Sequence, residues 1–349
     1  MDSKELENII PIPSIWENLK ELEKRLIQVS SSSDAYLTEI SQYLISAGGK
    51  RFRPLISLLA GELGDGSKEK VIDAGVSVEL IHLGSLYHDD VIDDATTRRG
   101  VESTNKKWSS TLSILAGDYL LARSSELAAE SLGLESVKLL ASTYAQLVEG
   151  QTKEVQFSFD TNHGTDDYLK IIEGKTASLI KTSAKLGAMA SGCKEETINS
   201  ISKWAWHSGI IFQITDDILD LSSDEKTLGK PSGNDIIEGT YTLPVLIALE
   251  KYPEKINKML FDVSENRVGV NEIISDMLPD IIDFQEINNS TALNTLSNSL
   301  PAYTFINSGS CIYSDLSIFS FHPVKHIAAG EGGMIVCNNI EDYKIIHAL

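Results

Sequence analysis

The chain has 349 residues, an apolar content of 42% and a formal net charge of −20. That apolar content suits a globular protein with a real core, in one large domain or two small ones. Such an acidic chain is not expected to bind nucleic acid, whose phosphates attract basic surfaces. No stretch approaches the roughly 18 apolar residues of a membrane span, no signal peptide is visible, and the three cysteines form no C-x-x-C pair, so we expect a cytoplasmic protein without disulfides.

From about residue 15 to residue 260, apolar residues recur with the period of an α-helix, and alternating strand patterns are scarce. For example, Val76, Leu80, Leu83 and Tyr87 share one helical face. Further helices are expected over residues 112–134, 136–157, 179–190 and 198–221. Helix-breaking residues separate them at 64–66, 162–164, 192 and 230–233. The sequence therefore predicts an all-α protein with long, mostly buried helices.

A compact basic turn over residues 48–54, with the sequence Gly-Gly-Lys-Arg-Phe-Arg-Pro, precedes one of these helices. Taken alone, it fits an ordinary helix start as well as it fits an anion site. Beside the acidic clusters described next, Lys50 and Arg53 favour a site for a phosphate group.

The first acidic cluster is a D-D-x-x-D pattern made of Asp89, Asp90 and Asp93. On a helix, positions i, i+1 and i+4 share a face, so three carboxylates would point to one place. They would repel one another, but they suit Mg²⁺, which is commonly held by a few carboxylates and substrate phosphates. His82 lies two turns earlier on the same stripe. The alternative is an acidic helix end neutralised by the two arginines that follow, Arg98 and Arg99.

The second cluster repeats the pattern with Asp216, Asp217 and Asp220, and Gln213 precedes it on the same face. A solvated acidic stretch would be the ordinary explanation. However, apolar residues surround these acids, and acids in a core need partners. Lys230 follows soon after. The two clusters together predict metal ions that clamp a diphosphate.

Residues 174–176, Gly-Lys-Thr, invite comparison with a nucleotide-binding loop, but that motif requires a glycine where Leu169 stands. We therefore interpret Lys175 and Thr176 as individual phosphate ligands on a helix.

These motifs, in this order, resemble those of the trans-isoprenyl diphosphate synthases, also called polyprenyl synthetases. The resemblance runs from about Leu19 to about Ser308, and we assign residues 1–308 to this domain. It implies an antiparallel helical bundle around a central cavity (the isoprenoid synthase fold), usually a homodimer. It also implies that isopentenyl diphosphate is condensed with an allylic diphosphate, and that the lipid product brings at most peripheral membrane contact.

The resemblance also implies roles for individual residues. The expected ligands of about three Mg²⁺ ions are Asp89, Asp90, Asp93, Asp216, Asp217 and Asp220. The expected catalytic residues are Asp89, Asp90, Asp93, Asp216, Asp217 and Lys175. The residues expected to hold the allylic diphosphate are Arg98, Lys175, Thr176, Gln213 and Lys230. Those expected to hold isopentenyl diphosphate are Lys50, Arg53, His82 and Arg99.

Three residues before the first cluster bear on product length. Ser85 and Ile81 lie one and two turns before Asp89, and Gly84 adjoins Ser85. Short-chain members of the family carry bulky aromatic residues there, which close the cavity. We therefore expect a product longer than farnesyl, in the hexaprenyl to octaprenyl range used for quinone side chains. The alternative is that Gly84 only permits close helix packing.

The last residues, 309–349, have a β-like pattern and resemble another family. They look like the lysine segment of DegT-type, pyridoxal-phosphate-dependent sugar aminotransferases, in which Lys325 would form the Schiff base. The segment is too short to build a core, so we expect no independent domain. It replaces the expected last helix of the synthase, as in a natural fusion, a misjoined reading frame or an artificial hybrid.

Four alternatives remain beside a medium- or long-chain synthase. A farnesyl or geranylgeranyl diphosphate synthase would differ only in product length. A terpene cyclase would carry a second metal motif of another composition. A non-catalytic subunit of a heteromeric synthase typically lacks one aspartate motif, whereas this chain has both. An aminotransferase is the weakest alternative, since most of its cofactor site is missing.

Overall fold

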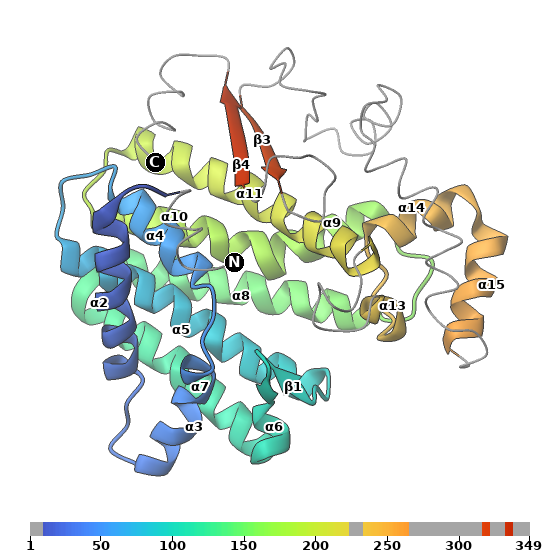
Figure 1. Ribbon diagram of the computed structural model, residues 1–349, viewed down its shortest axis with the longest axis horizontal. Coiled ribbons are helices and arrows are strands. Elements are labelled where there is room, and N and C mark those ends of the chain that lie inside the picture. Colours follow the sequence, from blue (N-terminus) through green and yellow to red (C-terminus); the bar gives the residue numbers. More distant parts are fainter. Residues whose placement is uncertain (1–9, 223–232, 265–315, 322–331, 338–349) are drawn as a thin grey trace. The chain divides into compact units, whose positions relative to one another are not determined.

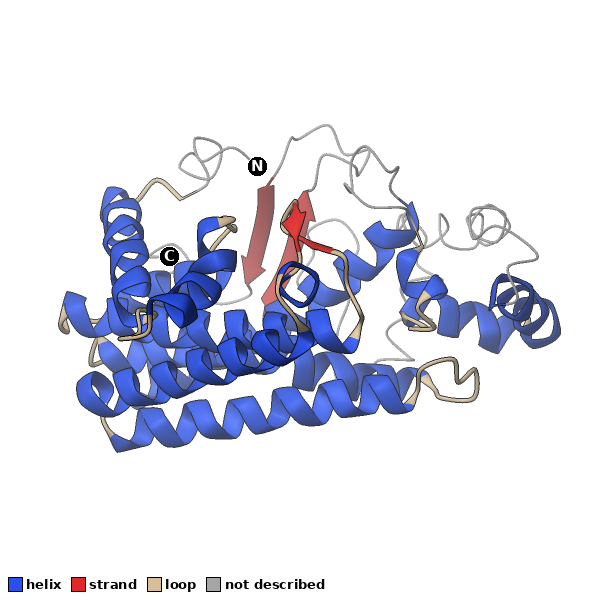
Figure 2. Ribbon diagram, turned by 90° about the horizontal axis from the view of Figure 1, so that it is seen from below, coloured by secondary structure: helices blue, strands red, loops and turns tan. Residues whose placement is uncertain are grey.

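The structure is a computed structural model that describes residues 10–222 and 233–264, together with the backbone of residues 316–321 and 332–337. Helices account for most of it (Figures 1 and 2), which confirms the all-α prediction. The helices before residue 128 are α2 (Pro13–Val29), α3 (Ala35–Ser46), α4 (Phe52–Gly61), α5 (Lys68–Ile92), α6 (Thr104–Lys107) and α7 (Ser110–Leu127). The later helices are η1 (Ala128–Leu132), α8 (Leu134–Gln156), α9 (Thr165–Ile172), η2 (Glu173–Ala177), α10 (Ser178–Ala190), α11 (Glu195–Ser222), α13 (Asn234–Ile237), α14 (Leu243–Lys251) and α15 (Pro253–Ser264).

The described residues fall into two compact units. Residues 10–147 and 177–207 form the first, and residues 148–176 and those from 208 onward form the second. The unit boundaries lie within the long helices α8 and α11 and within the short η2. Two motifs expected from the sequence therefore belong to different units: the first aspartate cluster to the first and the second cluster to the second.

Helix α5 is the central element of the first unit, and it packs against α2, α4, α7 and α10. Nearly every residue from Val71 to Tyr87 is buried, because the helix is apolar on all sides and can be covered on all sides. Its start at residue 68 is fixed by Ser67, whose hydroxyl accepts a hydrogen bond from the Lys70 amide. This packing holds the C-terminal turn of α5, which carries Asp89 and Asp90, against the unit's core.

Short loops separate the helices at residues 64–66, 162–164 and 192, where the sequence predicted breaks; of the predicted break at 230–233, residues 230–232 lie outside the described residues. Asp34 caps α3 by accepting hydrogen bonds from the amides of Tyr36 and Leu37. Gly192, between α10 and α11, has a φ of +73°, a left-handed conformation that glycine adopts without strain. Between α5 and α6, a two-stranded hairpin pairs β1 (Thr97–Arg98) with β2 (Val101–Glu102).

In the second unit, α14 packs against α9 and α15. Its core residues come from α9, α11, α14 and α15, and include Tyr168, Ile210, Val245 and Ile256. The backbone described near the C-terminus forms the antiparallel strands β3 (Leu316–Phe321) and β4 (Gly332–Cys337), with Leu316 opposite Cys337. The expected boundary near Gly309 lies outside the described residues, as does Lys325.

Candidate active site

The first aspartate cluster stands at the C-terminal end of α5, and its three acids differ in exposure. Asp89 is half-buried, Asp90 is fully buried, and Asp93 is exposed just beyond the last helical residue. Arg98 donates from Nε to Asp90 Oδ1 at 2.7 Å. Burial raises the pKa of Asp90, and the charge of Arg98 opposes that rise. Asp90 Oδ2 is buried without a hydrogen-bond partner in the described part of the chain, as expected of an oxygen that binds a cation.

The hairpin that follows brings two arginines back to the body of the first unit. Arg99 has a φ of +54° and Gly100 a φ of +76°, so the chain reverses there and Arg98 can reach Asp90. Arg99 Nη1 donates to the main-chain oxygen of Leu44 at 2.8 Å and to that of Gly48. The hairpin thus joins the aspartate cluster to the basic turn that precedes α4.

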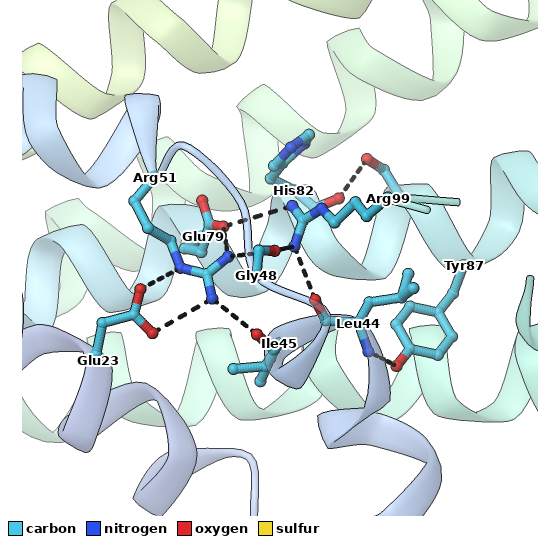
Figure 3. A network of polar contacts seen from close by, with 10 residues as sticks. Glu23, Leu44, Ile45, Gly48, Arg51, Glu79, His82, Tyr87 and Arg99 are labelled. Atoms are coloured by element: carbon cyan, nitrogen blue, oxygen red, sulfur yellow. Dashed lines mark hydrogen bonds and ion pairs between the residues drawn. The ribbon is translucent and has the colours of Figure 1, made fainter. Parts of the chain in front are cut away.

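Around that turn lies a group of guanidinium side chains that we call the arginine cluster: Arg51, Arg53, Arg98 and Arg99. Figure 3 shows how Arg51 and Arg99 lie beside two acids. Arg51 is buried between Glu23, at 2.5 Å, and Glu79, at 3.2 Å. Sequence reasoning missed Arg51, Glu23 and Glu79 as partners. The available signal was Glu79, which lies one turn before His82 on the same helical face.

The positive charges of all four arginines act on His82. Burial, followed by the charges of Arg53, Arg99, Arg98 and Arg51, holds the pKa of His82 well below its usual value. The imidazole is therefore neutral near pH 7 and can donate one hydrogen bond and accept another.

Two basic residues complete this part of the site. Arg53 is half-buried, and its Nε is buried without a hydrogen-bond partner among the residues that the structure describes. Burial lowers the pKa of Arg53, whereas the charge of Glu79 raises it. Lys50 is exposed on the turn. The first unit thus brings Arg53 and Arg99 close enough to His82 for their charges to act on it. These are three of the four residues expected to hold isopentenyl diphosphate.

In the second unit, a chain of hydrogen bonds leads to Asp217. Thr176 donates to Gln213 Oε1 at 2.7 Å, and Gln213 Nε2 donates to Asp217 Oδ1 at 2.8 Å. The hydroxyl of Tyr168 donates to Asp217 Oδ2 at 2.5 Å. Burial raises the pKa of Asp217 to about 6, although the hydrogen bonds from Tyr168 and Gln213 act against the rise. The structure thus brings together three expected site residues and adds Tyr168, which sequence reasoning missed.

The other two acids of the second cluster differ from Asp217. Asp216 is exposed, whereas Asp220 is buried. Asp220 accepts hydrogen bonds from two amides further along the chain: its carboxylate from Asp235 at 3.4 Å and its carbonyl from Gly233 at 2.9 Å. These bonds fix where the chain returns before α13. Lys230, expected to bind the allylic diphosphate, lies outside the described residues.

Lys175 belongs to η2, a single turn of π-helix between α9 and α10. Such turns are frequent at functional sites. Lys175 Nζ lies 2.5 Å from Glu154 Oε1. A Cβ on Gly150 of α8 would stand 2.6 Å from the Lys175 amide nitrogen, so glycine is required for α8 to approach this turn. The periodicity of the sequence gave no sign of the π-helical turn.

The three residues expected to set product length are buried on α5. Ile81 packs in a core cluster with residues of α8 and α10. Ser85 donates its hydroxyl hydrogen to the carbonyl of His82 at 2.8 Å. Gly84 faces α7, and a Cβ there would stand 3.0 Å from the carbonyl oxygen of Gly117. Gly84 therefore has a packing role, whatever else it does.

We asked whether the acidic residues suit Mg²⁺. No three His, Cys, Asp or Glu side chains of the described residues stand together as a preformed metal site. Asp90 nevertheless offers a buried oxygen without a hydrogen-bond partner, and carboxylates are the ligands that Mg²⁺ prefers. A metal that keeps several positions for water or phosphate oxygens does not need a closed protein cage. The residues therefore fit Mg²⁺ held jointly by protein and substrate.

Within the described ranges, no helix is long and apolar enough to cross a membrane.

Two family models match this chain. The model described as polyprenyl synthetase matches residues 34–277. The model described as DegT/DnrJ/EryC1/StrS aminotransferase matches residues 285–349. Both resemblances seen in the sequence are thus confirmed. The second match begins before residue 309, where the change of pattern was noticed.

Proteins named as prenyl diphosphate or polyprenyl synthases are similar to this chain, in agreement with the first family model. The chain is 43% identical over 220 residues to nonaprenyl diphosphate synthase of Mycobacterium tuberculosis, covering 63% of this chain and 65% of that protein. It is 40% identical over 233 residues to heptaprenyl diphosphate synthase component 2 of Geobacillus stearothermophilus, covering 67% and 73%. A crystal structure of polyprenyl synthase from Caulobacter crescentus, complexed with calcium and isoprenyl diphosphate, superimposes with a TM-score of 0.72 at 28% identity, covering 82% of this chain and 86% of that one.

Proposed function

This chain belongs to the polyprenyl synthetase family, and we propose that it condenses isopentenyl diphosphate head-to-tail with an allylic diphosphate in a Mg²⁺-dependent reaction. The observation that carries the proposal is a set of acidic, basic and hydrogen-bonding side chains in each unit. They are Asp90 with Arg98, the arginine cluster around His82, and Asp217 with Gln213 and Thr176. Buried acids and cations of this kind suit a substrate that brings both metal and phosphate.

Each group has a proposed task. Asp89, Asp90, Asp93, Asp216, Asp217 and Asp220 would hold Mg²⁺, which when bound neutralises the charge of the departing diphosphate. Arg98, Lys175, Thr176, Gln213 and Lys230 would hold the allylic diphosphate. Guanidinium, ammonium and hydroxyl donors fixed in place before the reaction stabilise the charge that develops as the allylic C–O bond breaks.

The second substrate would be held by Lys50, Arg53, His82 and Arg99. A neutral His82 can donate a hydrogen bond to a phosphate oxygen without adding a charge to the arginine cluster. The double bond of isopentenyl diphosphate attacks the allylic carbocation. The resulting cation then loses a proton, for which the released diphosphate is the proposed acceptor.

We expect a product longer than farnesyl diphosphate, of the type used for quinone side chains. Ser85 and Ile81 are small or aliphatic where a bulky aromatic would close the path of the growing chain. Relatives named for heptaprenyl and nonaprenyl products support a long chain, although geranylgeranyl diphosphate synthases are also similar.

A homodimer is the proposed assembly. Exposed aliphatic side chains on α7 and α8, namely Ile114, Leu115 and Leu134, offer apolar surface that a second copy could cover. A second candidate follows from two relatives that are named component 2 of a synthase. In that case this chain would need a different partner chain to be active.

The test is an assay of the purified full chain with Mg²⁺, farnesyl diphosphate and labelled isopentenyl diphosphate, with products separated by length. We expect elongation by the protein alone, and its loss in the separate variants Asp89→Ala and Asp216→Ala with helical content retained. Elongation by both variants would refute the metal role. Folded protein that never elongates either allylic starter, farnesyl or geranyl diphosphate, would favour the partner-dependent component.

A further inference from the structure

Glu79 is the acid in contact with two members of the arginine cluster (Figure 3). Its side chain is only 2% exposed, and Oε1 lies 3.2 Å from Arg51 Nη1 and 3.9 Å from Arg99 Nη2. Burial raises the pKa of Glu79, and the charges of Arg51, Arg99 and Arg53 act against the rise. A carboxylate so placed stabilises guanidinium groups that would otherwise repel one another at close range.

The two arginines that contact Glu79 also hold the main chain before Lys50. Arg51 donates to the carbonyl oxygens of Ile45, at 3.1 Å, and Gly48, at 3.3 Å. Arg99 donates to those of Leu44 and Gly48. These carbonyls belong to the end of α3 and the turn after it. The arginines therefore fix the shape of a segment that ends at the exposed Lys50.

Gly49 shows how closely the two side chains lie on this turn. Its φ is +149°, and a Cβ there would stand 2.9 Å from both Arg51 Nη1 and Arg99 Cζ. The turn is thus packed directly against the two guanidinium groups. If either group moved, the backbone that carries Lys50, and with it the start of α4 at Phe52, would lose its support.

We propose that Glu79 is a positioning residue for the isopentenyl diphosphate site, and that it acts by holding Arg51 and Arg99 against the turn at Gly48 and Gly49. The inference rests on the function proposed above. Glu79 does not contact the substrate, because a carboxylate would repel a diphosphate and both of its contacts are with arginines. The donors that the turn would offer to the substrate are then Lys50 and Arg53. The Nε of Arg53 is buried without a partner in the described ranges.

Glu23 gives the proposal an internal comparison. It contacts Arg51 through both oxygens, at 2.5 Å and 3.3 Å. Unlike Glu79, its side chain is 37% exposed, so water can partly replace it. Loss of Glu23 should therefore disturb Arg51 less than loss of Glu79, and should leave Arg99 in place.

The experiment measures KM for each substrate and kcat in the full chain and in Glu79→Gln, which keeps the shape of the side chain and removes its charge. We expect KM for isopentenyl diphosphate to rise about tenfold or more, because buried charge pairs lose much when one partner is removed. KM for the allylic diphosphate should change by less than about twofold. Glu23→Gln should give a smaller rise of the same kind. Glu135→Gln, on an exposed acid paired with Lys138, serves as the control and should leave both constants unchanged.

Two results would overturn the proposal: an unchanged KM for isopentenyl diphosphate in folded Glu79→Gln, or an equal rise in both KM values. If Glu79→Gln does not fold, Glu23→Gln becomes the test. An unchanged KM for isopentenyl diphosphate in that variant would also refute the proposal that these acids hold the arginines against the turn. Calorimetric titration with isopentenyl diphosphate alone separates this proposal from the proposed function. If the chain binds isopentenyl diphosphate, binds it more weakly in Glu79→Gln, and never elongates a substrate, the result would contradict the proposed function and support the positioning role.

Discussion

Among single residues, His82 shows how surroundings decide the state of a side chain. Its pKa is held well below the usual value, first by burial and then by Arg53, Arg99, Arg98 and Arg51. The unfolded chain takes up a proton near the ordinary pKa of histidine, about 6.5, whereas the folded chain does not. Stability supplied by the neutral His82 is therefore complete above that value and is lost as the pH falls below it.

We predict that this one group makes the free energy of unfolding fall as the pH is lowered from about 7 to about 5. Urea unfolding at several pH values, in the wild type and in His82→Gln, measures it. The carboxylates titrate in both proteins, so the difference between their pH profiles isolates His82. Parallel profiles would show that His82 is protonated in the folded protein.

Tyr168 is the second residue with a testable role. Its hydroxyl donates to Asp217 Oδ2 at 2.5 Å, and this bond lowers the pKa of Asp217 against the effect of burial. We predict that Tyr168→Phe raises the Mg²⁺ concentration needed for half-maximal activity about tenfold, since a hydrogen bond to a charged group contributes about 1.5–3 kcal/mol. Mn²⁺ binding, followed directly by electron paramagnetic resonance, should weaken to a similar extent.

The control is Tyr252→Phe, because Tyr252 lies in the same unit but is exposed. It should change neither measurement. Unchanged Mn²⁺ binding in Tyr168→Phe would mean that the hydroxyl supports the fold of the second unit without orienting Asp217.

Among elements, the contact between α5 and α7 determines how product length can be tested. Gly84 lies against the backbone of Gly117, so a large side chain there would force the helices apart. Ser85 is buried beside it and donates a hydrogen bond to the His82 carbonyl within its own helix. We predict that Ser85→Phe shortens the longest product, seen by chromatography of the dephosphorylated alcohols, with the first condensation retained.

Gly84→Phe is the contrasting variant, because the structure predicts that it lowers stability as well as changing product length. An unaltered product distribution in folded Ser85→Phe would show that the growing chain follows another path.

The order of the helices was predictable from the sequence, whereas some of their irregularities were not. The range 136–157 differs from α8 by two residues at its start and one at its end, and 179–190 differs from α10 by one residue at its start. The agreement is close because apolar periodicity and helix-breaking residues are local signals. The π-helical turn η2 was missed. It depends on the close approach of Gly150 to the amide of Lys175, a contact that the local sequence does not encode.

For the whole molecule, the match of residues 285–349 to aminotransferases raises the question of whether the chain binds pyridoxal phosphate. Lys325 is the residue that would form a Schiff base, but the segment holds a small part of such an enzyme. We predict that pyridoxal phosphate added to the full chain produces no absorption band near the visible edge beyond that of a Lys325→Ala control. A band lost only in that variant would indicate a second chemistry.

The helical class and the family could be predicted from the sequence, because D-D-x-x-D spacing on a helix and a basic turn are short-range patterns. The same patterns proposed the acids and bases of the site, but the tertiary structure was needed to show which of these groups are buried and what they contact. Asp90 is fully buried and accepts a hydrogen bond from Arg98, whereas Asp93 is exposed. Glu79 and Tyr168 contact site residues that are distant in the sequence. The physical reason is that burial and ionic contacts depend on packing between helices, and packing sets desolvation and charge balance in a way that spacing along one helix cannot.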